Sequence, residues 1–218
     1  GSSAVEVDLA TGRGVGGEAH NDLLLSIENL IGSDYDDRFT GDNANNMLEG
    51  GAGADTLEGK GGADTLDGGD GIDTASYQSS GASVDVDLAS GIGRYSQAEG
   101  DMLSSVENLI GSDYADTLTG SSENNNLIGG GGADVIDGAS GIDTVSYIGS
   151  AAVNVDLTTG LGSGGDADGD RLTSIEILIG SSYDDTLSGD AADNSLEGRS
   201  GDDLLALSGG RSVYDGYV

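Results

Sequence analysis

Single apolar residues recur every nine positions over long stretches of this chain, each between two mostly polar residues and after a glycine-rich hexamer. One apolar position in three favours a very short strand with one buried side chain, whereas a run rich in Gly, Asp and Asn favours a turn. The sequence therefore predicts turn-strand units of nine residues. The side chains expected in the core are Phe39, Leu48, Leu57, Leu66, Leu118, Leu127, Ile136, Val145, Leu187, Leu196 and Leu205.

The nine-residue blocks group into three arrays. They start at Gly32, Gly41, Gly50, Gly59 and Gly68, then at Gly111, Gly120, Gly129 and Gly138, and finally at Gly180, Gly189 and Gly198. Between the arrays lie alternating segments (SVDVDL, VNVDL), each followed by a Gly-rich loop and a segment such as LSSVENLIG or LTSIEILIG. Alternation predicts strands with one buried face.

The predicted organisation is one continuous solenoid, because gain or loss of whole units between arrays is what a solenoid tolerates. Its segments are a partial inter-array β segment at 1–31, a first array at 32–76, an inter-array β segment at 77–110, a second array at 111–146, an inter-array β segment at 147–179, a third array at 180–206 and an irregular C-terminal end at 207–218.

A three-residue strand buries almost nothing alone, so coils must stack on one another and pair their strands in parallel sheets. Two blocks make one coil of about 18 residues. The predicted fold class is thus all-β, a parallel β-roll or β-solenoid. Turns one coil apart share an edge, which brings the sixth-position acids into ladders, such as Asp37, Asp55 and Asp73 on one edge and Asn46 and Asp64 on the other.

The net charge of the chain indicates what these ladders bind. The chain has 7 Lys plus Arg against 40 Asp plus Glu, a formal net charge of −33, and 41 glycines. Such a composition is typical of disorder, but a merely solvating acidic chain has no reason to keep a register. Stacked acids repel one another, and Ca²⁺ offsets this because it accepts about six to eight oxygens in adaptable geometry. Nucleic acid is not expected as a partner, since the few cations are scattered.

Features of other protein classes are missing from the sequence. There is no Cys, no apolar run of membrane-spanning length and no basic, apolar leader, so membrane insertion is not expected and export would need another signal. We also find no H-E-x-x-H and no G-x-S-x-G, and the lone histidine, His20, is expected to be a solvated loop residue. Paired carboxylates leave a glycosidase open by residue type, but a substrate cleft lacks aromatic lining. We expect no enzyme activity.

The blocks resemble the GGxGxDxUx nonapeptides of the repeats-in-toxin (RTX) family, the hemolysin-type calcium-binding repeats. GKGGADTLD from Gly59 and GGGGADVID from Gly129 carry the resemblance most clearly, and clear nonapeptides cover about half of the chain. The resemblance implies Ca²⁺ ions between turns of consecutive coils. Each ion would be held by the sixth-position carboxylates of both turns, by backbone carbonyls at positions 2 and 4 of one turn, and by those at positions 1 and 3 of the other.

Carried onto this chain, the resemblance implies about six calcium sites. The best site joins Gly51, Gly53 and Asp55 to Gly68, Asp70 and Asp73. The other pairs are Asn46 with Asp64, Asp116 with Asp134, Asn125 with Asp143, Asp185 with Asp203, and Asp37 with Asp55, and Gly59, Gly61, Gly129, Gly131, Gly138 and Gly198 are further turn ligands.

Some positions depart from the family pattern. The second block of every array has Asn at position 6, which is either a weaker neutral ligand or a side chain that caps the turn backbone. The first blocks carry Tyr35, Tyr114 and Tyr183 at position 4, where the family prefers Gly. The loop from Asp166 to Asp170 begins like an EF-hand, but Ile177 stands where the loop-closing Glu is required. Whether this loop, or those around Asp101 and Asp22, holds another ion stays open.

The resemblance implies a module of a secreted, type I exported bacterial protein that folds on calcium outside the cell or at its surface. The alternative is a structural protein, such as an adhesin stalk, a surface-layer protein or a filament subunit, whose solenoids associate in calcium. Self-association and a cell-surface or carbohydrate partner stay open.

Overall fold

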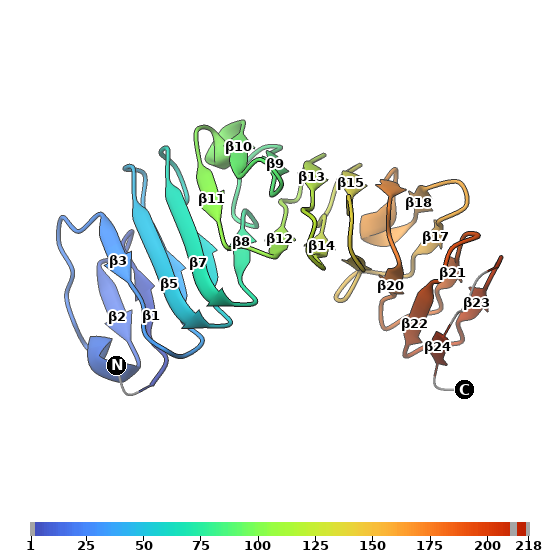
Figure 1. The fold of residues 1–218 in the computed structure, drawn as a ribbon, viewed down its shortest axis with the longest axis horizontal. Helices are drawn as coiled ribbons and strands as arrows, with labels where there is room; N and C mark the ends of the chain where they lie inside the picture. The colour runs from blue at the N-terminus through green and yellow to red at the C-terminus, as the bar shows by residue number, and fades with distance from the viewer. Residues whose placement is uncertain (1–2, 210–212, 217–218) are drawn as a thin grey trace. The chain divides into compact units, whose positions relative to one another are not determined.

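The computed structural model describes residues 3–209 and 213–216, which fall into two compact units, residues 1–110 and 111–218. Both units are built from short strands and short 3₁₀ helices, and the described residues contain no α-helix (Figure 1). Within the same ranges, no helix has the length and apolar character to cross a membrane.

The first unit consists of two sheets that share the stacked coils. The strand orders within it are β2-β1-β4-β6-β8-β12 and β9-β10-β11-β7-β5-β3. Its elements are β1 (Glu6–Asp8), β2 (Arg13–Val15), η1 (Gly17–Ala19), β3 (Asn29–Ile31), β4 (Arg38–Thr40), β5 (Met47–Gly53), β6 (Thr56–Glu58), β7 (Thr65–Gly71), β8 (Thr74–Ser76), β9 (Asp85–Asp87), β10 (Ile92–Arg94), η2 (Ser96–Ala98), β11 (Met102–Ser104) and β12 (Asn108–Ile110).

The second unit repeats this plan, with strand orders β14-β16-β20-β22-β24 and β23-β21-β17-β18-β19-β15-β13. Its elements are β13 (Thr117–Thr119), β14 (Asn126–Ile128), β15 (Val135–Asp137), β16 (Thr144–Ser146), β17 (Asn154–Asp156), β18 (Leu161–Ser163), η3 (Gly165–Ala167), β19 (Arg171–Thr173), β20 (Ile177–Ile179), β21 (Thr186–Ser188), β22 (Ser195–Arg199), β23 (Leu204–Ala206) and β24 (Val213–Gly216).

Strands of successive coils pair in parallel, as the sequence predicts. Phe39 lies opposite Leu57, and Leu118 lies opposite Ile136. Successive blocks alternate between the two sheets, so β4, β6 and β8 neighbour one another in one sheet while β5 and β7 pair in the other. The predicted all-β parallel roll is confirmed.

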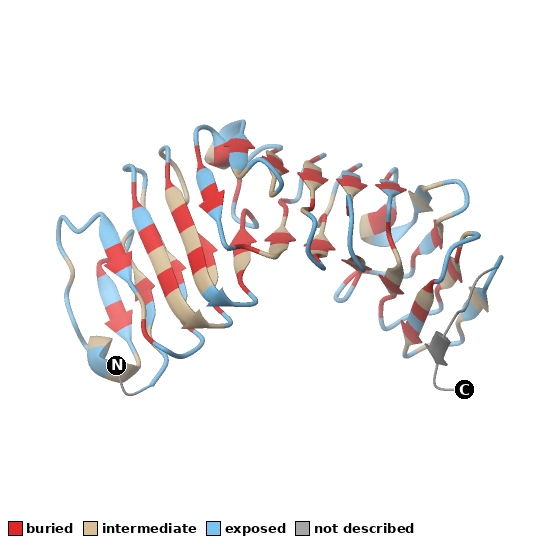
Figure 2. Ribbon diagram, viewed as in Figure 1, coloured by how far each residue is buried: buried red, intermediate tan, exposed pale blue. Residues whose placement is uncertain are grey.

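The core is a stack of eighth-position side chains. Every one of them from Phe39 to Leu196 is buried, and Leu205 is half-buried. Figure 2 shows this as one buried residue between more exposed neighbours along most of the three-residue strands. The inter-array segments extend the same stack with Val86 and Leu109 in the first unit and with Val155 and Leu178 in the second.

The inter-array segments differ from the expected Gly-rich loops, because each contains an additional strand. In the first unit β10 pairs antiparallel with both β9 and β11, and in the second β18 does so with β17 and β19. Gly91 and Gly160 make the reversal possible, since both have a φ of +67° and leave no room for a Cβ beside the carbonyl of the adjacent strand. The parallel roll therefore carries an antiparallel excursion after the first array and another after the second.

Part of the C-terminal segment 207–218 also continues the coil repeat. Strand β24 pairs in parallel with β22, with Leu196 opposite Tyr214. Residues 210–212 and 217–218 of this predicted irregular end lie outside the described residues.

Candidate calcium-binding turns

The sixth residue of each block lies at the end of its turn, directly before the strand, and is almost entirely withdrawn from solvent. Asp55, Asp64, Asp73, Asp134 and Asp143 are each no more than 1% exposed. The sixth residues of the first and second blocks, from Asp37 to Asn194, are also buried, and Asp203 is half-buried. A buried carboxylate destabilises the fold unless it is paired with a cation, hydrogen-bonded or bound to a metal. The partners of its two oxygens therefore decide what each of these residues does.

One oxygen of each carboxylate joins a ladder that runs along the turns. Asp73 Oδ1 accepts a hydrogen bond from the backbone N–H of Asp55 at 2.7 Å, and Asp55 Oδ1 accepts one from the N–H of Asp37 at 2.7 Å. The same contact links Asp64 to the N–H of Asn46, Asp134 to that of Asp116, Asp143 to that of Asn125, and Asp203 to that of Asp185, each at 2.8 Å. Every predicted pair is therefore brought together by the fold.

The second oxygen separates the turns into two kinds. In the first kind, which we call closed turns, the backbone N–H of position 2 donates to the sixth-position side chain of the same block. In the first block of each array, position 2 is Ser, and its hydroxyl also donates to the acid. In the block from Gly32, the N–H of Ser33 lies 2.5 Å from Asp37 Oδ2, and its hydroxyl lies 3.1 Å from Oδ1. Ser112 closes on Asp116 and Ser181 closes on Asp185 in the same way.

The Asn blocks are closed as well. The side-chain oxygen of Asn46 accepts the N–H of Asp42 at 2.9 Å, that of Asn125 accepts the N–H of Ser121 at 2.7 Å, and that of Asn194 accepts the N–H of Asp190 at 2.8 Å. This is the capping geometry that the sequence left open for a sixth-position Asn.

In the second kind, the open turns, positions 2 and 4 have positive φ, so that the position-2 N–H does not close on the acid. Gly51 and Gly53 have φ of +108° and +129°. Lys60, Ala139 and Arg199 adopt φ near +70° at position 2 although they carry side chains. Such angles cost a non-glycine residue about 1 kcal/mol or more, which marks this turn shape as one that the surrounding structure imposes.

Open turns leave one carboxylate oxygen buried and without a hydrogen-bond partner. The residues are Asp55, Asp64, Asp73, Asp134, Asp143 and Asp203, in each case at Oδ2. Every one of them belongs to a block whose position 4 is a glycine with positive φ. An unpartnered buried oxygen of this kind is a position where a cation or water completes the structure.

A further oxygen lies beside the unpartnered oxygen of Asp55. A Cβ added to Gly50 would overlap both Asp55 Oδ2 and the carbonyl oxygen of Gly68 on the next coil. Carboxylate and carbonyl oxygens are the ligands that Ca²⁺ prefers. The residues at this turn therefore fit the ion that the resemblance implies, with Asp55 and Asp73 as its charged ligands and turn carbonyls as the others.

Electrostatics agree with this assignment. Burial raises the pKa of Asp64 from 3.8 to about 7 and that of Asp134 to about 8. Burial also raises the pKa of Asp55, Asp73 and Asp143, and nearby carboxylates add to each rise, such as Asp67 at Asp73 and Glu176 at Asp143. Charged carboxylates at these positions are thus held at a free-energy cost that a bound cation would remove.

The predicted pairs consequently differ in what they offer an ion. In the pair of Asp55 with Asp73, the first acid has its free oxygen directed at the following coil. In the pairs that begin at Asp37, Asn46, Asp116, Asn125 and Asp185, the first side chain is already closed by its own turn. Among the described residues, no group of three or more His, Cys, Asp or Glu side chains is arranged to hold a metal ion.

Two buried acids of the inter-array segments belong to the same ladders, and the sequence analysis did not place them there. Asp101 Oδ1 accepts the N–H of Asp64 at 2.8 Å, and its Oδ2 accepts the hydroxyl of Tyr77 at 3.1 Å. Asp170 makes the same contacts with the N–H of Asp134, at 2.8 Å, and with the hydroxyl of Tyr147, at 2.9 Å. The acids follow 3₁₀ segments rather than nonapeptides, so only the repeated Ser-Tyr before each segment signals them.

The tyrosine hydroxyl gives a first testable prediction. Tyr147→Phe removes the donor to the buried Asp170 and leaves Oδ2 without that partner, so we expect a loss of about 1–3 kcal/mol in the free energy of unfolding. The measurement is denaturant unfolding in calcium. Tyr183→Phe is the matched control, because Tyr183 is 60% exposed and its loss of a hydroxyl should change stability by less than about 0.5 kcal/mol. Equal effects of the two variants would contradict the prediction.

The parallel coils and their acidic open turns define a calcium-binding β-roll protein. A family model of the RTX calcium-binding nonapeptide repeat matches the chain in four copies, at residues 26–57, 40–75, 110–145 and 174–213. The chain therefore belongs to this hemolysin-type repeat family, and Ca²⁺ is its cofactor. No curated protein matches the chain as a relative.

Proposed function

We propose that this calcium-binding β-roll is a module of a secreted bacterial protein, exported by a type I route, and that it folds when it meets calcium outside the cell or at its surface. The observation that carries the proposal is the set of six buried carboxylate oxygens without a partner. A fold that needs cations at its turns is unstable where free calcium is scarce and stable where it is plentiful. Ion binding is then coupled to folding, because the sites do not exist in the unfolded chain.

Two properties of the sequence support this role. A net charge of −33 favours an expanded chain in the absence of cations. The absence of Cys suits an exported protein that does not depend on oxidative folding. An expanded, unpaired chain is also the state that a narrow export channel can accept.

We also propose that the chain catalyses no reaction itself. The support is that His20, the single histidine of the chain, is exposed on a loop. A pocket of about 260 Å³ in the second unit is lined by Leu157, Gly160, Leu172, Ile175 and Asp190 among others, and Asp190 is the ionisable side chain in it. Such a lining offers no pair of an acid and a base for catalysis.

The test of the proposed function is a calcium titration of the full chain, followed by far-ultraviolet circular dichroism. In a chelating buffer at pH 7 we expect the spectrum of a predominantly disordered chain, and on addition of calcium a cooperative gain of β signal. Magnesium at the same concentration should produce much less, because it demands a stricter octahedral geometry. A full β signal in excess chelator would show that folding does not depend on calcium and would defeat the proposal.

A further inference from the structure

The open oxygen of Asp143 is directed toward a coil that is not a nonapeptide. Asp143 is 0% exposed, its Oδ1 accepts the N–H of Asn125, and its Oδ2 is buried without a hydrogen-bond partner. The coil that follows contributes the connection between β19 and β20, which contains Ser174, Ile175 and Glu176. An ion at Asp143 Oδ2 would therefore need ligands from this connection.

Glu176 holds the place of a sixth-position acid in that coil. Ile177 lies opposite Thr144 in the parallel pair of β20 and β16, so the residue before it aligns with Asp143. Glu176 Oε2 accepts the backbone N–H of Asp143 at 2.9 Å, which is the contact that aspartates make elsewhere in the ladder. Glu176 is half-buried, so its carboxylate is partly desolvated beside that of Asp143.

A backbone carbonyl completes the likeness to the open turn of Asp55. A Cβ on Gly138 would overlap the carbonyl oxygen of Ser174 and would lie 2.7 Å from Asp143 Oδ2. At Gly50 the corresponding neighbours are the carbonyl of Gly68 and Asp55 Oδ2. Ser174 reaches this place with a φ of +54°, an angle that serine rarely adopts.

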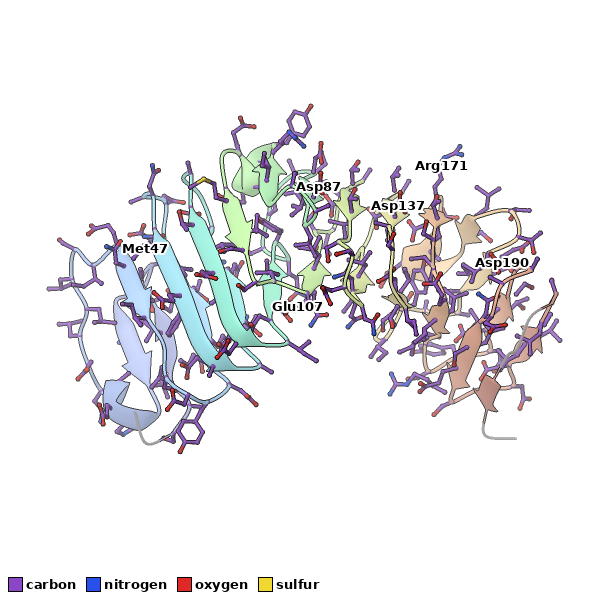
Figure 3. All side chains as sticks on the ribbon, viewed as in Figure 1. Met47, Asp87, Glu107, Asp137, Arg171 and Asp190 are labelled. Atoms are coloured by element: carbon purple, nitrogen blue, oxygen red, sulfur yellow. The ribbon has the colours of Figure 1, made fainter. Side chains whose placement is uncertain are left out.

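The first unit contains the same arrangement at its own junction. Glu107 Oε2 accepts the N–H of Asp73 at 2.9 Å, and Asp73 Oδ2 is buried without a partner. Ser105, with a φ of +51°, places its carbonyl oxygen against Gly68. Glu107, labelled in Figure 3, lies on the connection between β11 and β12. The two connections, Ser105-Val106-Glu107 and Ser174-Ile175-Glu176, thus present the same oxygens to an unpartnered aspartate.

We propose that a Ca²⁺ ion binds between Asp143 and Glu176, where the second array meets the inter-array segment, and that an equivalent ion binds between Asp73 and Glu107. The charged ligands are one aspartate from a nonapeptide and one glutamate from the short connection, with the Ser174 or Ser105 carbonyl as a neutral ligand. The glutamate supplies the extra reach that the shorter turn requires. This inference rests on the proposed function and adds a mixed kind of site to it.

The test compares Glu176→Gln with the wild-type chain by equilibrium dialysis against calcium. Gln keeps an oxygen for the N–H of Asp143 but removes the charge. Loss of an outer partner alone weakens metal sites by about 10–100-fold, so loss of a charged ligand should weaken one ion by at least about 10-fold. The chain would then bind one ion fewer at a calcium concentration that just saturates the wild type. Glu197→Gln is the control, because it removes the same charge from an exposed side chain of the same unit and should bind as the wild type does.

The outcomes separate this inference from the proposed function. Unchanged number and affinity of ions in Glu176→Gln would overturn the mixed site and leave the calcium-binding module standing. Absence of calcium binding by the wild type would remove both. If Glu176→Gln does not fold, anomalous scattering from wild-type crystals grown in calcium decides: a peak between Asp143 and Glu176 supports the site, and a peak at Asp55 and Asp73 without one there overturns it.

Discussion

Without calcium, the protein should become more stable as the pH falls from 8 to 4. Burial raises the pKa of Asp64 to about 7, that of Asp134 to about 8, and those of Asp101 and Asp170 to about 6, all from 3.8. The folded chain therefore binds protons that the unfolded chain has released in this range. Their contribution to stability is fully present below about pH 4 and is lost as the pH rises through these raised values.

With calcium present, the pH dependence should reverse. Carboxylates bind the ion only when deprotonated, so acidification weakens binding and removes the stability that the ion confers. The measurements are the β signal of circular dichroism in calcium-stripped buffers and the melting temperature in calcium-containing buffers, both from pH 4 to pH 8. The two curves should have opposite slopes, and a calcium-free β signal that rises with pH would contradict the raised pKa values.

General charge repulsion must be separated from the buried carboxylates, because acidification also lowers the net charge of the whole chain. Repeating the calcium-free series at about 1 M salt does this, since a Debye length of about 3 Å screens exposed charges and leaves buried ones largely unaffected. A pH dependence of stability that persists at this salt concentration arises from the buried carboxylates of the ladders. A pH dependence that disappears arises from exposed charges.

Asp55→Asn should have opposite effects on stability with and without calcium. The substitution keeps an oxygen for the N–H of Asp37, at 2.7 Å, and removes a buried charge that faces Asp73 and Asp37. In chelator at pH 7 the variant should be more stable than the wild type by about 1 kcal/mol or more, because no uncompensated carboxylate remains. In calcium it should be less stable and bind calcium at least about 10-fold more weakly, because a charged ligand is lost.

The control for this reversal is Asp34→Asn, which removes the same charge from an exposed side chain of a neighbouring turn that is not among the predicted ligands. Its stability should change by less than about 0.5 kcal/mol in either buffer. The folded fraction seen by circular dichroism in chelator and unfolding by denaturant in calcium give these values. If Asp55→Asn destabilises the protein equally in both buffers, the carboxylate serves the fold through its hydrogen bond alone.

The roll itself was predictable from the sequence because its period is direct evidence of its geometry. A single apolar residue per block, such as Leu57 or Leu118, can be buried only if blocks stack, and stacking two blocks per coil sets which residues lie opposite one another. The sixth-position acids followed from the same period. Their burial and their pairing one coil apart are what the structure shows.

The difference between open and closed turns was not predicted, although the residue at position 4 signals it: every open turn has a glycine there, whereas the first blocks, which are closed, have Tyr35, Tyr114 and Tyr183. Ser33 closes its turn through its own N–H and hydroxyl, whereas Lys60 adopts positive φ although it is not glycine. Competition between a local hydrogen bond and a strained backbone is not readable from spacing. Asp101 and Glu176 were missed because they enter the ladders from segments without the nine-residue period.

The ladder of hydrogen bonds at the turns has a direction. Each sixth-position carboxylate accepts from the N–H of the coil before it, from Asp37 through Asp73 to Glu107. Removing a coil on the C-terminal side thus leaves a buried N–H donor without an acceptor. Removing one on the N-terminal side leaves only a carboxylate oxygen without its donor, and a cation or water can still satisfy that oxygen. The two ends of a ladder are therefore not equivalent, and removal of coils from the N-terminal end should destabilise the roll less than removal from the C-terminal end.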